Sequence, residues 1–72
     1  MDTKIIFGQR IKELRNEKQL KQSELAAALG VHTTQICEME TGKKTTTIER
    51  LVILANYFNV SADYLLGLTD KK

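Results

Sequence analysis

The sequence predicts an all-α fold, organised as one compact domain of five helices over residues 1–72. Apolar residues recur at the three- and four-residue spacing of helices, and no segment shows the alternation of a strand or the turn dipeptide of a hairpin. Proline is absent and 42% of the residues are hydrophobic, a composition typical of globular proteins. A chain of this length makes one domain and buries only about 60% of the surface that its unfolded form exposes.

The first helix is predicted to begin at Asp2 or Thr3, either of which can act as N-cap, and to end near Lys18. Its apolar residues follow the i, i+4, i+7 spacing that places them in one narrow stripe. They are Phe7, Ile11 and Leu14. Arg10 falls at the edge of this stripe, and residues 16–19 form a polar connection to the next helix.

Residues 22–42 predict two short helices joined by a tight turn, and the rest of the chain is arranged around them. The first of the two ends at Gly30, which can adopt the positive φ that terminates a helix. The second runs from about Thr33 to Thr41, with Gly42 as its C-terminal stop. Two helices joined by a turn of about 3–4 residues that holds a glycine match the helix-turn-helix motif.

Glu40 lies on the inner face of the predicted helix 33–41, beside Ile36. An unpaired buried carboxylate is very costly, so Glu40 needs a cationic partner. Arg10, at the edge of the first helix's stripe, is the candidate, and we therefore predict an Arg10–Glu40 ion pair. A role for Glu40 in acid–base catalysis has little support because no second titratable residue accompanies it.

A fourth helix is predicted to follow Thr47, its N-cap, and to end at Tyr57 or Phe58. Its inner stripe is expected to consist of Ile48, Leu51, Leu54, Ala55 and Phe58. Ile53 and Tyr57 project nearly opposite. Together with Tyr64 they form a candidate contact patch for a second subunit or another protein, although scattered exposed apolar residues are also normal.

The pattern of residues 61–67 predicts one more short helix. Ser61 can cap it, and Gly67 ends it. Its apolar residues are Tyr64, Leu65 and Leu66. Residues 68–72 are expected to form a loose tail.

Composition excludes several classes of function. The net charge of +2 favours an anionic partner only weakly. The single cysteine, Cys37, forms no disulfide within the chain, and with only His32 in reach no metal site or other cofactor is expected. A reducing, cytoplasmic setting fits best. The longest apolar run, residues 25–31, is far short of the roughly 20 residues that span a membrane, and the N-terminus lacks the hydrophobic region of a signal peptide.

The chain resembles a known family over nearly its whole length, from about Phe7 to Gly67. The runs LKQSELAAALGVHTTQICEMETG and TIERLVILANYFNVSADYLLG resemble the helix-turn-helix domains of the lambda-repressor-like, or Xre, family of phage and bacterial transcription regulators. The run FGQRIKELRNEKQL is similar to that family's first helix. The resemblance implies a five-helix domain that binds double-stranded DNA, a repressor acting as a homodimer on a palindromic operator, with no small-molecule substrate.

The resemblance also assigns roles to particular residues. Those that match base-facing positions of the family's recognition helix are Thr33, Thr34 and Glu38. Those that match phosphate-contacting positions, or that add a cation beside them, are Lys21, Gln22, Thr41, Lys43 and Lys44. His32 stands where the family often has a capping serine, so Thr33 is a candidate to take over as N-cap of the recognition helix.

Two other classes of function are a protein-interaction module and an enzyme. An antitoxin-like module that neutralises a protein partner and binds DNA secondarily would use the patch of Ile53, Tyr57 and Tyr64. An enzyme is not supported, because Ser23 and Ser61 lack the histidine and acid that nucleophilic catalysis requires.

Overall fold

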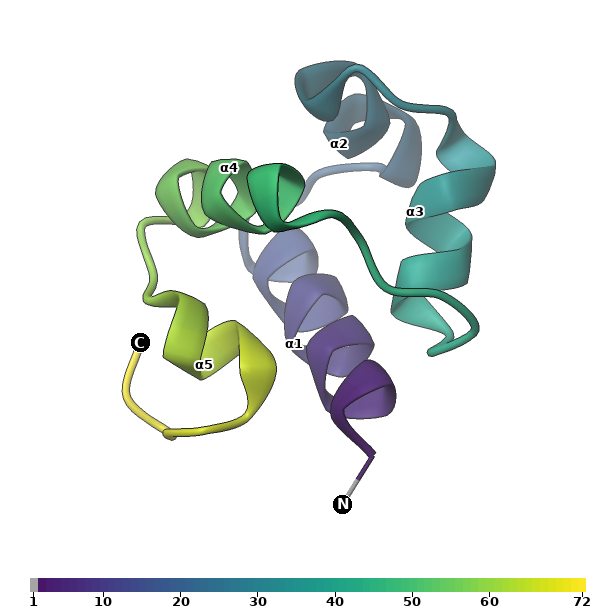
Figure 1. Ribbon diagram of the computed structural model, residues 1–72. Helices are drawn as coiled ribbons and strands as arrows, with labels where there is room; N and C mark the ends of the chain where they lie inside the picture. The colour runs from purple at the N-terminus through teal and green to yellow at the C-terminus, as the bar shows by residue number, and fades with distance from the viewer. Residues whose placement is uncertain (1) are drawn as a thin grey trace.

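The computed structural model describes residues 2–72 as five α-helices joined by short connections (Figure 1). The helices are α1 (Thr3–Glu17), α2 (Gln22–Leu29), α3 (Thr33–Glu40), α4 (Ile48–Phe58) and α5 (Ala62–Leu66). No strand occurs within residues 2–72. Helix α1 lies at the centre, with α3 packed on one side of it and α5 on the other. The predicted all-α, five-helix fold is confirmed.

Three helices begin where the sequence predicts a side-chain cap. Asp2 accepts a hydrogen bond from the Lys4 amide at 3.0 Å, Thr47 accepts one from the Arg50 amide at 3.2 Å, and Ser61 accepts one from the Tyr64 amide at 3.0 Å. Each bond satisfies an amide that the first turn of a helix leaves without a partner.

The N-cap residues before α2 and α3 are Lys21 and His32, whose side chains make no cap hydrogen bond. In each helix a side chain of the first turn reaches back instead. Glu24 accepts from the Lys21 amide at 2.8 Å, and Gln35 accepts from the His32 amide at 3.0 Å. This is half of a capping box. The idea that Thr33 replaces His32 as N-cap is wrong, because Thr33 is already the first helical residue.

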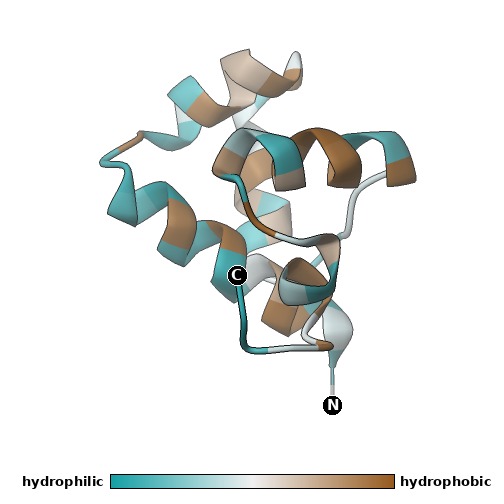
Figure 2. Cartoon of the chain, turned by 90° about the vertical axis from the view of Figure 1, so that its left-hand side faces the viewer, coloured by the Kyte–Doolittle hydropathy of each residue, from teal (hydrophilic) through white to brown (hydrophobic). Residues whose placement is uncertain are grey.

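The core is formed by the inner stripes that periodicity predicts. Its buried apolar residues are Phe7, Ile11, Leu14, Leu25, Ala26, Leu29, Ile36, Met39, Leu54, Phe58, Tyr64 and Leu65. In Figure 2 hydrophobic and hydrophilic residues alternate along the helices, as one buried face per helix requires. Ile48 was predicted on the inner stripe of α4 but is 78% exposed, because it is the first residue of the helix and lies beyond the edge of the packed core.

The C-terminal residues are held against the domain, so the prediction of a loose tail is wrong. The Arg10 guanidinium donates to the carbonyl oxygens of Tyr64 and Thr69 and to the carboxylate of Asp70. The Lys72 ammonium lies 2.7 Å from the Glu17 carboxylate, which raises the pKa of that lysine. Sequence patterns could not show this, because each contact joins residues far apart in the chain.

Candidate nucleic-acid interface

Helix α3 presents a polar face to solvent, opposite the fully buried Ile36. Thr34 and Glu38 lie one turn apart on this face, and Thr33 lies at the N-terminal end of the helix. Both threonines are exposed, whereas the Glu38 side chain is only 27% exposed. The three residues predicted to face bases are therefore on an accessible part of α3, with Glu38 the most withdrawn of them.

Glu40, on the opposite face of α3, is paired with Arg15. Its carboxylate accepts from Arg15 Nε at 2.6 Å and from Arg15 Nη2 at 3.0 Å. The predicted Arg10–Glu40 pair is wrong. Arg10 and Arg15 are five residues apart and so lie about 140° apart around α1, at opposite edges of its buried stripe. The edge that carries Arg15 faces α3, and the edge that carries Arg10 faces α5.

Gln22 ties the start of α2 into the same network. Its side-chain amide donates to Glu40 at 3.0 Å, while Arg15 Nη1 donates to the Leu20 carbonyl oxygen at 2.7 Å. The hydrogen bonds that Arg15 donates to the Glu40 carboxylate raise the pKa of Arg15. This network joins α1, α2 and α3 and fixes α3 against the other two helices. Arg15 could have been found from the sequence only by testing both edges of the α1 stripe.

The connection after α3 folds back over the end of that helix. Gly42 takes a φ of 80°, and the amides of Lys43 and Lys44 donate to the Glu38 carbonyl oxygen at 3.0 and 3.3 Å. The Lys44 ammonium lies 3.4 Å from the Glu38 carboxylate. The Thr41 hydroxyl donates to the Cys37 carbonyl oxygen at 3.0 Å, so the hydroxyl proton is already engaged in a hydrogen bond to the backbone of α3.

The candidate patch of Ile53, Tyr57 and Tyr64 does not exist as one surface. Ile53 and Tyr57 are exposed, but Tyr64 is only 7% exposed. The guanidinium carbon of Arg10 lies over the Tyr64 ring, 4.3 Å from the centroid of the ring. The predicted grouping of the three is wrong, because the short helix α5 turns Tyr64 inward against α1.

The part of the chain that the structure describes contains neither a candidate metal site nor a candidate membrane-spanning helix. Within residues 2–72, histidine, cysteine and acidic residues nowhere gather in the groups of three or more that could hold a metal ion. None of the helices there is long and apolar enough to cross a membrane.

Residues 11–65 match the family model described as "Helix-turn-helix". The chain belongs to the Xre, or lambda-repressor-like, helix-turn-helix family. Members of this family are DNA-binding transcription regulators and are not enzymes. The predicted family and the prediction that the protein is not an enzyme are therefore confirmed.

Two relatives of this Xre-family chain are similar over most of its length. An uncharacterized HTH-type transcriptional regulator, YobD of Bacillus subtilis, is 37% identical over 65 residues, covering 90% of this chain and 58% of YobD. Control protein C.SmaI of Serratia marcescens is 36% identical over 66 residues, covering 92% of this chain and 79% of C.SmaI. The chain thus spans little more than half of YobD but most of C.SmaI.

Two solved structures share the fold. The restriction-modification controller protein C.AhdI of Aeromonas hydrophila superposes with a TM-score of 0.75 at 30% identity, covering 85% of this chain and 92% of C.AhdI. SinR, a master regulator for biofilm formation whose structure was solved in complex with DNA, gives a TM-score of 0.73 at 36% identity. That alignment covers 83% of this chain and 97% of SinR.

Proposed function

We propose that this Xre-family protein is a sequence-specific repressor that binds a palindromic operator in double-stranded DNA as a homodimer. The observation that carries the proposal is the outward face of α3, where two exposed threonines and a carboxylate are followed by two lysines fixed at the helix end. SinR, which has the same fold, was solved in complex with DNA. A cytoplasmic site of action, where bacterial DNA lies, is part of the proposal.

The proposed contacts divide into two sets. Thr33, Thr34 and Glu38 would meet base edges in the major groove, where a threonine methyl packs on a thymine methyl and a carboxylate accepts from cytosine N4. The residues that would contact phosphates are Lys21, Gln22, Thr41, Lys43 and Lys44. On binding, Lys44 would leave the Glu38 carboxylate, and the Thr41 hydroxyl would leave the Cys37 carbonyl oxygen. Two copies of α3 would enter successive major grooves about 34 Å apart.

Selection of binding sites from a randomised DNA pool at two salt concentrations tests this function. We expect a palindromic site to be enriched. Thr34→Ala should reduce the preference for that site over other DNA by about tenfold, the size of one mismatched base pair. Lys43→Ala should weaken binding to all sequences and lower the slope of log K against log salt by about 0.9, because one phosphate contact is lost.

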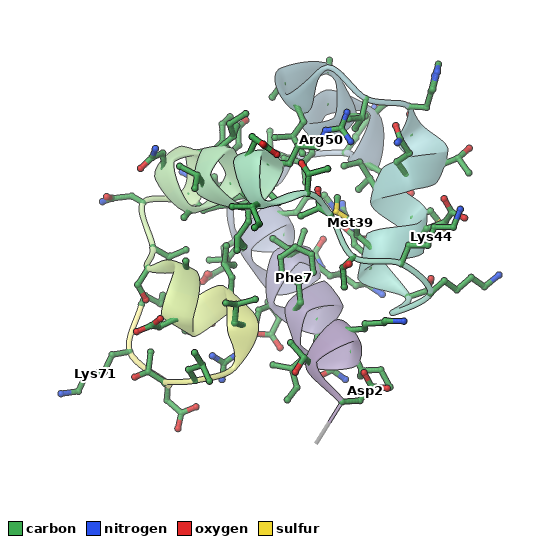
Figure 3. The ribbon with its side chains drawn as sticks, in the orientation of Figure 1. Asp2, Phe7, Met39, Lys44, Arg50 and Lys71 are labelled. Carbon is green, nitrogen blue, oxygen red and sulfur yellow. The ribbon has the colours of Figure 1, made fainter. Side chains whose placement is uncertain are left out.

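Lys71→Ala is the matched control for these variants. Lys71 carries the same charge but lies on the opposite side of the molecule from Lys44 (Figure 3). It should leave both specificity and salt slope unchanged. If no sequence is enriched even at low salt, the repressor proposal fails. A stoichiometric protein that co-purifies with the chain would then favour the antitoxin-like alternative.

For the homodimer we propose a surface on the other side of α4 from Ile53. An apolar groove of about 320 Å³ runs between α1, the connection before α4 and the end of α5. Its lining includes Phe7, Leu51 and the strongly exposed Ile48. Thr45 and Thr46 line both this groove and a cleft beside α3. A second copy seated in the groove would therefore lie next to the DNA-facing connection.

Ile48→Asp is accordingly expected to convert the dimer to monomer, because a buried unpaired carboxylate is costly. Sedimentation equilibrium at micromolar protein measures the change. Ile53→Asp, which changes an exposed isoleucine of the same helix, is the control and should leave the dimer intact. Loss of the dimer in Ile53→Asp alone would assign the interface to the opposite side of α4, and a monomeric wild type on its operator would contradict the homodimer.

A further inference from the structure

A small cleft of about 120 Å³ lies between α3, the connection after it and the start of α4. Its floor is apolar, and its wall carries two cations, one carboxylate and two threonines. The lining residues are Leu29, Val31, Gln35, Glu38, Met39, Lys44, Thr45, Thr46 and Arg50. In Figure 3 Arg50 lies between α4 and the α2–α3 pair. The cleft thus borders the same α3 face that is proposed to read bases.

Arg50 differs from the other two arginines of the chain in that its guanidinium makes no hydrogen bond or ion pair with residues 2–72. Arg10 donates to Asp70 and two carbonyl oxygens, and Arg15 donates to Glu40 and a carbonyl oxygen. Within residues 2–72 no acceptor lies within hydrogen-bond or ion-pair distance of the Arg50 guanidinium. A guanidinium is always charged and has five N–H donors, so Arg50 retains its full capacity to bind an anion.

The donors of Arg50 are also accessible. The residue as a whole is half-buried. No side-chain nitrogen of the described residues is both inaccessible to solvent and without a hydrogen-bond partner, so the guanidinium nitrogens can be reached from outside. The backbone below them is fixed, because the Arg50 amide is held by the Thr47 side chain at 3.2 Å in the first turn of α4. The cleft presents a guanidinium that is anchored but free at its tip.

The charge balance of the cleft favours an anion. Its lining carries two cations, Lys44 and Arg50, against one carboxylate, Glu38, so its net charge is positive. Thr45 and Thr46 add hydroxyl groups to the same wall. A planar guanidinium matches two oxygens of a phosphate with parallel hydrogen bonds, and a neighbouring hydroxyl can supply a third donor.

We propose that Arg50 binds a phosphate of the DNA backbone at the flank of α3, with Thr45 and Thr46 beside it. The inference rests on the proposed function and adds a contact from α4 to those of the helix-turn-helix. Because Arg50 meets the backbone and not a base, it contributes affinity without sequence preference.

Fluorescence anisotropy of the full chain, on a duplex with the selected site and on an unrelated duplex across a salt series, tests the inference. Arg50→Gln should weaken binding about tenfold, the size of a lost charge-assisted hydrogen bond. The factor should be the same on both duplexes. The slope of log K against log salt should fall by about 0.9. Arg50→Lys should keep the slope and lose part of the affinity, because a lysine supplies the charge but not the paired hydrogen bonds.

Lys71→Gln is the matched control for loss of one charge, and thermal melting of each variant shows that the fold is retained. An unchanged slope and affinity for Arg50→Gln, while Lys43→Ala lowers both, would overturn the inference and leave the proposed function standing. A loss confined to the selected site, with the slope unchanged, would show that Arg50 reads a base and would also overturn it. Absence of salt-dependent binding by the wild type would overturn the inference together with the proposed function.

Discussion

Replacement of Glu40 by alanine is expected to lower the free energy of unfolding by about 3–5 kcal/mol, the usual cost of removing one partner of a buried ion pair. The Glu40 side chain is 3% exposed and the Arg15 side chain 12% exposed, so solvent screens the pair little. Removing the carboxylate leaves the Arg15 guanidinium and the Gln22 amide without their shared acceptor. Chemical denaturation of wild type and variant measures the loss.

A second ion pair of the same molecule provides the control. The Lys72 ammonium lies 2.7 Å from the Glu17 carboxylate, but both side chains are about half exposed. Glu17→Ala should therefore change the unfolding free energy far less than Glu40→Ala, because exposed pairs are screened. A double-mutant cycle with Arg15→Ala isolates the coupling within the buried pair. A loss below 1 kcal/mol for Glu40→Ala would show that the network does not hold α3 in place.

This contribution to stability should not depend on pH in the neutral range. The pKa of Arg15 is raised by the hydrogen bonds that it donates to the Glu40 carboxylate. A cation whose pKa is raised on folding stabilises the protein at pH values below its unfolded pKa, and this stabilisation is lost as pH rises through the folded pKa. For an arginine that range lies far above neutrality.

The sequence predicted the helices and most of the core because these depend on local spacing and on capping residues. The stripe of Phe7, Ile11 and Leu14 is buried as predicted, and Thr47 and Ser61 cap the helices that follow them. Spacing places a residue on a face of its own helix but does not say which neighbour that face meets.

The wrong Arg10–Glu40 pair has this origin. Arg10 and Arg15 both border the α1 stripe, and only the packing of α3 and α5 decides which of them meets Glu40. Tyr64 was assigned to an outer patch because its helix is too short for a clear periodicity. Arg50 was passed over because nothing in the sequence shows that its guanidinium stays unpaired among residues 2–72. The proposed DNA contacts depend on an interface that spacing alone cannot place.

A methyl group at Gly8 is expected to cost about 1–3 kcal/mol of stability, the typical penalty of overpacking a core. Two effects of opposite sign act on Gly8→Ala. Gly8 lies within α1, where alanine is favoured over glycine by about 0.5–1 kcal/mol. Against this, an added Cβ would overlap the Met39 carbonyl oxygen and lie 2.9 Å from that of Glu40.

The steric effect should exceed the gain in helix propensity because the obstructing atoms belong to the backbone of α3 and cannot rotate away. Helix α3 cannot retreat from α1 without stretching the hydrogen bonds of Glu40 to Arg15. The variant should therefore displace α3. If α3 reads DNA as proposed, the preference for the selected site should fall along with the stability.

Gln9→Ala is the control for this substitution, because Gln9 is the exposed neighbour of Gly8 on the same helix. It tests helix propensity alone and should stay within about 0.5 kcal/mol of wild type. Denaturant unfolding of the two variants compares the effects directly. If Gly8→Ala proves more stable than wild type, α1 and α3 are not in backbone contact at this point. The orientation of the recognition helix would then have to come from the Glu40 network alone.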